Sequence, residues 1–338
     1  MSFLIEFLKK LFGIGKKPPA PHVDPKPVPV VDNPSEPALI TVNRVLLIIY
    51  NPTMDFATGE KLSDQSGWQN PDDLVVSFSA DVLQTSHGMA RYEVVERIEV
   101  DEFPKKVDGF RYTPSLYLDA LHGVTPPHQP EDVDYHAILN DFNIAERIRN
   151  NEIDEVWVFA FPHAGFYESI MVGKDAFWCN APPLEQTNHI ARQFIMMGFS
   201  YERGVGEMLE SFGHRLESLM AKTFARTRGD ANLWERYTRY DKKNPGQSEV
   251  GNVHFAPNSE RDYDWENMRL VPSKCDDWLD FPHLRGFTKQ VNADEWGNGD
   301  IRLHHQWWQE RIPHVAGRLN GIHNNWWQYI MNANNIDL

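Results

Sequence analysis

A predicted helix over residues 204–224 carries the side chains best suited to chemistry in this sequence. At about 100° per residue, four of them fall within an arc of roughly 80°: Glu207, Glu210, His214 and Glu217. The opposite face is apolar. A histidine among three carboxylates holds its proton with a raised pKa unless a metal ion takes the proton's place. The same pattern is also typical of an ordinary solvated face, so a functional site and a charged surface are both open interpretations.

Two glycines flank this polar face, Gly206 and Gly213, seven residues apart. Glycine in a helix interior costs up to about 1 kcal/mol relative to alanine. Their presence predicts that another part of the backbone packs closely against the helix.

The turn over residues 161–169 is the second candidate. His163 and Glu168 follow an apolar run that ends at residue 161, where an open parallel sheet places its catalytic groups. Gly165 would let a backbone N–H approach a ligand. The helix with His214 follows the next predicted strand, so its start is expected at the same edge of the sheet. The alternative is a loop whose two aromatic side chains cover the core.

Together, the two segments predict a metal-assisted hydrolase that acts on a peptide or a glycan. We expect a divalent ion, zinc, to be bound by His163, His214 and one carboxylate. Glu217 is the expected carboxylate ligand, with Glu168 and Glu210 as the catalytic carboxylates, although either of these two could be the ligand instead. Zinc with an open coordination position lowers the pKa of bound water toward 7, and a free carboxylate can then act as base. The spacing matches no His-Glu-x-x-His metalloprotease signature.

Two other function classes fit the same residues. A metal-free acid/base glycan hydrolase would use Glu168 and one carboxylate of the helix. A non-catalytic glycan- or protein-binding module, or a delivered effector, would use aromatic side chains alone. His254, Asp262 and Asp264 are further possible ligands, although a lone histidine beside apolar residues is more often structural. The sequence contains no Gly-x-Ser-x-Gly, no phosphate loop and no dinucleotide-binding Gly-x-Gly-x-x-G.

The elements that must position these groups form an α/β pattern over residues 39–226. Strands are predicted at 44–50, 91–100, 155–161 and 193–198, and helices at 70–87, 135–150 and 204–224. Strands that alternate with helices indicate a mostly parallel sheet flanked by helices. Residues 227–338 are irregular, with two short helices near 301–312 and 325–332. Seven of the eleven tryptophans lie after residue 260, and they either staple this region or line a recognition surface that shapes a substrate subsite.

Four segments resemble an uncharacterised family of bacterial and fungal proteins, some of them secreted. They are IDEVW at 153–157, GFYES at 165–169, FWCNAPP at 177–183 and GVGEMLESFGHRLES at 204–218. The resemblance covers most of residues 40–330 and implies no activity.

The first seventeen residues differ in charge from the rest of the chain. The protein has 338 residues and a net charge of −15, and without a clustered basic surface it is not expected to bind nucleic acid. Residues 1–17, however, are basic and amphipathic, and residues 18–38 contain eight prolines. A basic amphipathic segment on a stiff linker predicts a tag or anchor, for an anionic membrane surface or for a groove on a protein assembly.

The chain shows no cleavable signal peptide and no apolar run of about 20 residues. A cytoplasmic, membrane-associated or non-classically exported protein is therefore expected. Cys179 and Cys275 are either two buried thiols or one long-range disulfide.

Overall fold

A computed structural model of the protein describes residues 36–336. The predicted tag over 1–17 and residues 18–35 of the predicted linker lie outside these described residues. Among residues 36–336, no helix combines the length and the apolar composition needed to cross a membrane. Cys179 and Cys275 are both buried free thiols.

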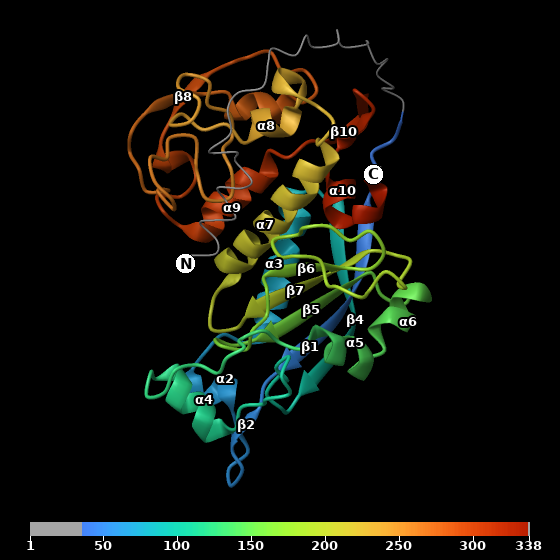
Figure 1. Ribbon diagram of the computed structural model, residues 1–338. Coiled ribbons are helices and arrows are strands. Elements are labelled where there is room, and N and C mark those ends of the chain that lie inside the picture. The colour runs from blue at the N-terminus through green and yellow to red at the C-terminus, as the bar shows by residue number, and fades with distance from the viewer. Residues whose placement is uncertain (1–35, 337–338) are drawn as a thin grey trace, which may run out of the picture. The chain divides into compact units, whose positions relative to one another are not determined.

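The centre of the protein is a five-stranded sheet with the order β4-β1-β5-β7-β6 (Figure 1). Four strands run parallel: β1 (Thr41–Tyr50), β4 (Ala90–Val100), β5 (Glu155–Ala160) and β7 (Phe194–Ser200). β6 (Ser169–Val172) pairs antiparallel with β7 at one edge. The register places Leu47 of β1 opposite Trp157 of β5. β5 is buried along its whole length, as expected for a parallel strand covered on both faces.

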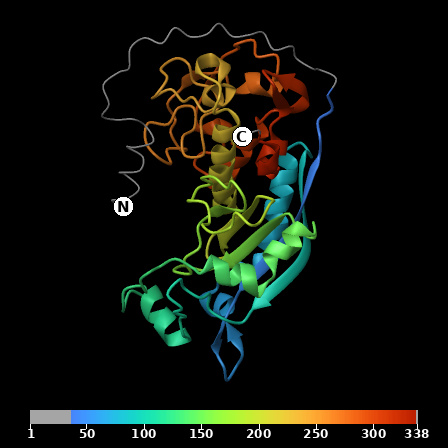
Figure 2. The same ribbon diagram turned by 45° about the vertical axis from the view of Figure 1, so that its right-hand side comes forward.

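Helices cover both faces of this sheet, which confirms the predicted α/β architecture. α3 (Pro71–Thr85) begins at Asn70, whose side chain accepts a hydrogen bond from the backbone of Asp72. α3 packs beside α7 (Val205–Thr223), and Phe78 of α3 contacts Phe212 of α7 with ring centres 5.8 Å apart. Figures 1 and 2 show α5 and α6 on the opposite face.

The single helix predicted over 135–150 is wrong. The chain forms α5 (Tyr135–Asp141) and α6 (Ile144–Arg149) instead. Asn143 lies between them with a φ of 50°, a left-handed conformation that interrupts a right-handed helix.

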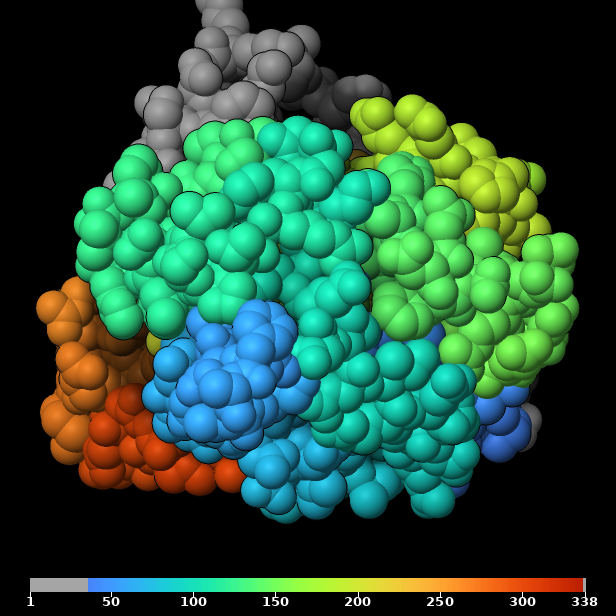
Figure 3. Space-filling view, turned by 90° about the horizontal axis from the view of Figure 1, so that it is seen from below, coloured from blue at the N-terminus to red at the C-terminus, as the bar shows by residue number. Residues whose placement is uncertain are grey.

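A hairpin and a helical segment cover the end of the sheet at which β1 and β4 terminate. The hairpin is β2 (Thr53–Asp55) with β3 (Glu60–Lys61), followed by α2 (Leu62–Ser66). α4 (Pro114–Leu121) belongs to the segment after β4. Figure 3 looks onto this end, where blue-green atoms of that segment lie above and to the right of the blue atoms of the hairpin.

The region after residue 226 is built from short elements. Its helices are α8 (Leu233–Tyr237), α9 (Ile301–Glu310) and α10 (Trp327–Met331). Its strand pairs are β8 (Val271–Ser273) with β9 (Lys289–Val291), and β10 (His314–Leu319) with β11 (Ile322–Asn325). The 3₁₀-helices are Gly229–Ala231, Cys275–Asp280, Ala293–Glu295 and Ala333–Asn335.

The tryptophans of this region form its core. All seven after residue 260 are at most 8% exposed: Trp265, Trp278, Trp296, Trp307, Trp308, Trp326 and Trp327. Trp278 and Trp326, for example, meet edge to face with ring centres 5.7 Å apart. These tryptophans therefore staple a loop-rich region, and the alternative that they line a recognition surface is wrong.

The two glycines of α7 are positions of close approach. A Cβ atom on Gly206 would lie 2.4 Å from Cγ2 of Ile301 and 3.1 Å from the backbone nitrogen of Arg302, both in α9. A Cβ atom on Gly213 would lie 2.7 Å from Cγ2 of Val253. The predicted close packing against α7 is confirmed, and at Gly206 it involves another backbone.

Replacing Gly206 by alanine is therefore expected to lower the free energy of unfolding by about 1–3 kcal/mol, through overpacking against α9. In a solvent-exposed helix the same change would raise it by up to about 1 kcal/mol. Urea unfolding of the wild type and the variant measures the difference. The loss should be smaller in an Ile301→Ala background, where the clashing Cγ2 atom is absent. An equal loss in both backgrounds would contradict the packing explanation.

Candidate metal centre

α7 and a loop of the C-terminal region together build the candidate site. α7 carries Glu210 and His214 one turn apart, on the face predicted from their spacing. The loop that contains His254 approaches α7 because the backbone N–H of Val253 donates to Oε1 of Glu217 at 3.1 Å. The absence of a side chain on Gly213 leaves room for Val253 at this contact.

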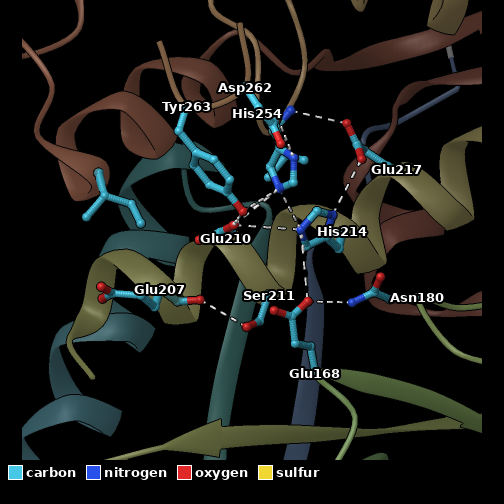
Figure 4. A network of polar contacts seen from close by, with 12 residues as sticks. Glu168, Asn180, Glu207, Glu210, Ser211, His214, Glu217, His254, Asp262 and Tyr263 are labelled. Atoms are coloured by element: carbon cyan, nitrogen blue, oxygen red, sulfur yellow. Dashed lines mark hydrogen bonds and ion pairs between the residues drawn. The ribbon is translucent and has the colours of Figure 1, made fainter. Parts of the chain in front are cut away.

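Three donor atoms converge between these elements (Figure 4). Nε2 of His254 lies 3.1 Å from Nε2 of His214 and 3.2 Å from Oε1 of Glu210. Nε2 of His214 lies 3.9 Å from the same carboxylate oxygen. Donor atoms about 2.0–2.2 Å from a tetrahedral zinc ion are about 3.3 Å apart, close to the distances seen here. Glu210, His214 and His254 therefore form a cluster that could hold a metal ion.

The outer nitrogen of each imidazole faces a carboxylate. Nδ1 of His254 lies 3.0 Å from Oδ1 of Asp262, and Nδ1 of His214 lies 3.7 Å from Oε2 of Glu217. A carboxylate beyond a histidine ligand fixes the tautomer in which Nδ1 carries the hydrogen and Nε2 offers its lone pair. The two Nε2 atoms lie 3.1 Å apart, within hydrogen-bond distance, so either a proton or a metal ion can lie between them.

The electrostatics of the cluster favour a cation at its centre. Burial raises the pKa of Glu210, but hydrogen bonds from His214, His254 and Tyr263 outweigh it and hold this pKa well below its ordinary value. Burial lowers the pKa of His214, but Glu210 and Glu217 beside it raise it to about 10. A metal ion that binds here must therefore displace a proton from His214.

A cavity adjoins the cluster. It has a volume of about 420 Å³ and lies at the carboxyl ends of β5 and β7, beside the start of α7. Its polar lining includes Glu168, His163 and Ser211. Oε2 of Glu168 lies 3.9 Å from Nε2 of His214 and accepts a hydrogen bond from the side chain of Asn180. Glu168 therefore stands between the cavity and the cluster.

The remaining predicted residues lie around the three donors. His163 lines the cavity but is not one of the converging donors, and its Nδ1 lies 3.8 Å from Oε1 of Glu131. Glu217 lies behind His214, on its Nδ1 side. Glu207 turns back to the start of α7, where its carboxylate accepts the backbone N–H of Gly204 at 3.1 Å.

Three residues of the loop over 252–265 make contacts that the sequence does not predict: Asp262, Tyr263 and Asp264. No sequence pattern points to Tyr263, but its hydroxyl donates to Oε1 of Glu210 at 2.7 Å. Asp262 and Asp264 looked equivalent, but Asp264 accepts the backbone N–H of Glu260 and stabilises the loop itself. Acidic and aromatic residues alternate after His254, and this pattern is visible in the sequence. In a loop, however, residue spacing does not determine in which direction each side chain points.

Comparisons of the chain with protein-family models, with curated proteins and with solved structures found no match. The resemblance of residues 40–330 to an uncharacterised family stays a prediction.

Proposed function

We propose that this protein is a zinc-dependent hydrolase of peptides or glycans, with Glu210, His214 and His254 as metal ligands. The observation that carries the proposal is the convergence of two imidazole Nε2 atoms and one carboxylate oxygen, with a carboxylate behind each imidazole. Two histidines and one carboxylate are a ligand set of catalytic zinc sites, which keep a further position open for water or substrate.

The neighbouring groups suit hydrolysis. Zinc in this position would act as a Lewis acid that polarises the scissile bond and acidifies water. Glu168 is placed to accept a proton from the attacking water and to pass it to the leaving atom, since it lies between the donor cluster and the cavity. The cavity volume falls within the range of small-ligand pockets and suits one peptide side chain or one sugar ring.

Metal analysis of the purified protein tests the proposal. We expect about one zinc ion per chain in the wild type, and a loss of stoichiometric zinc in His214→Ala and in His254→Ala, because each substitution removes a ligand. His283→Ala, an exposed histidine, is the matched control and should keep its zinc. Zinc should also raise the melting temperature of the wild type and of the control, but not of the two ligand variants.

His163→Ala separates the two ligand sets. Zinc retained in this variant supports the cluster around His254, whereas zinc lost with His163 and retained in His254→Ala would contradict it. A wild-type protein that binds no zinc after reconstitution would overturn the metal proposal altogether.

A further inference from the structure

We infer that the phenol oxygen of Tyr263 is the fourth protein ligand of the metal held by Glu210, His214 and His254. This inference rests on the proposed metal site and adds a fourth protein ligand to it. The added ligand changes which coordination positions of the metal remain for water or substrate. It also assigns a function to a residue of unusual backbone conformation.

The distances place the phenol oxygen among the donors. Oη of Tyr263 lies 2.7 Å from Oε1 of Glu210 and 3.0 Å from Nε2 of His254. These separations match the 3.1 Å between Nε2 of His254 and Nε2 of His214. An oxygen that is this close to two ligand atoms lies within reach of an ion bound to both. The phenol oxygen therefore lies beside two of the three donors that could hold the ion.

The loop holds Tyr263 in this position at an energetic cost. Its φ is 56°, a left-handed conformation that is rare for a bulky aromatic residue. The backbone N–H of Tyr263 donates to the carbonyl of His254 at 3.2 Å, and the Tyr263 ring packs on the His254 imidazole with centres 4.4 Å apart. Strained residues persist where the surroundings force them, and they concentrate at ligand sites. In this conformation the phenol oxygen contacts Glu210 and His254.

Ligation by Tyr263 leaves Glu168 free for another function. Figure 4 shows Tyr263 and Glu168 approaching the donor cluster from different sides. On metal binding, the phenol O–H bond breaks, an O–metal bond forms and the proton leaves to solvent. The metal would then be held by four protein ligands, and water or substrate would have to bind as a fifth ligand, from the side of Glu168 and the cavity.

Copper(II) is a suitable probe, because it binds nitrogen and oxygen donors more tightly than the other divalent first-row metals. A phenolate ligand gives Cu²⁺-loaded protein a visible phenolate-to-copper charge-transfer band. We expect this band in the wild type at one equivalent of Cu²⁺. Tyr263→Phe should lose the band, still bind one equivalent, and bind at least about tenfold more weakly. Tyr167→Phe, from the neighbouring cavity, is the matched control and should keep the band.

The outcomes separate this inference from the proposed function. Stoichiometric Cu²⁺ without the band in the wild type, or a band that survives in Tyr263→Phe, overturns the ligation by Tyr263 and leaves the three-residue site intact. A wild type that binds neither Cu²⁺ nor Zn²⁺ overturns both. Loss of the band together with retained stoichiometry in Tyr263→Phe supports the inference, because a structural function of the phenol would not produce the band.

Discussion

Replacing Glu168 by glutamine is expected to lower kcat for hydrolysis by about 10²- to 10⁴-fold while the zinc content stays at the wild-type level. General base catalysis typically contributes a factor of this size, and glutamine keeps the shape of the side chain while removing its ability to accept a proton. The measurement is the hydrolysis of a peptide or glycoside substrate, found by screening the wild-type protein, alongside metal analysis of each sample.

The position of Glu168 also predicts how its neighbour acts. Asn180 donates to the Glu168 carboxylate, so Asn180→Ala should reduce kcat less than Glu168→Gln does, since the base remains but is less well oriented. Glu152→Gln changes an exposed carboxylate paired with Arg147 and serves as the matched control. Zinc lost in Glu168→Gln would show that this carboxylate is a ligand. Unchanged activity would show that it takes no part in the reaction.

The sequence predicted the four parallel strands of the sheet but not the antiparallel edge strand β6. β1 and β5 are covered on both faces, so they need continuous apolar residues, and that pattern is visible without any structure. β6 has only four residues and pairs on one side, and so short an apolar run does not by itself separate a strand from a buried loop. The break between α5 and α6 depends on the left-handed conformation of one asparagine, Asn143.

The sequence predicted the part of the candidate site that lies on a helix, but not the part that lies in a loop. Glu210 and His214 lie on one helix, where the residue spacing fixes their relative direction. His254 lies in a loop forty residues later, and its position depends on tertiary contacts such as the one between Val253 and Glu217. His163 does lie at the carboxyl end of β5, as the topology predicts, but its imidazole is placed beside Glu131. Residue spacing in a helix determines which side chains share a face, whereas residue spacing in a loop does not.

The sequence did not predict the buried ion pair that joins the sheet to α7. Arg215 lies on the apolar face of α7, three residues after Phe212 and four before Leu219. A charged residue at an apolar position of a helix is the sequence feature that could have indicated a buried ion pair. Arg215 forms an ion pair with Glu155 of β5, and both side chains are 1% exposed. Its second terminal nitrogen donates to the carbonyl of Ile330 in α10 at 3.0 Å.

The other groups around Glu155 complete a buried network. The indole nitrogen of Trp157 donates to Oε1 of Glu155 at 2.8 Å. The side-chain amide of Asn43 donates to Oε2 of Glu155 at 3.0 Å and to the carbonyl of Met331 at 2.9 Å. The network therefore links β1, β5, α7 and α10, so the α/β domain and the C-terminal region share one set of buried contacts.

Replacing Glu155 by glutamine should therefore lower the free energy of unfolding by about 3–5 kcal/mol, because the Arg215 guanidinium would remain buried without a counter-charge. Removing both charges in Glu155→Gln/Arg215→Met should recover most of this loss, since an apolar replacement avoids the cost of an unpaired buried charge. Glu102→Gln, in an exposed pair with Arg111, should change the free energy of unfolding by less than about 1 kcal/mol.

Denaturant unfolding followed by tryptophan fluorescence and by far-UV circular dichroism measures all three variants. Because the network joins the two parts of the chain, both signals should shift together in Glu155→Gln. If the fluorescence transition alone moved, the C-terminal region would be unfolding independently of the sheet, and the coupling through Arg215 would be refuted.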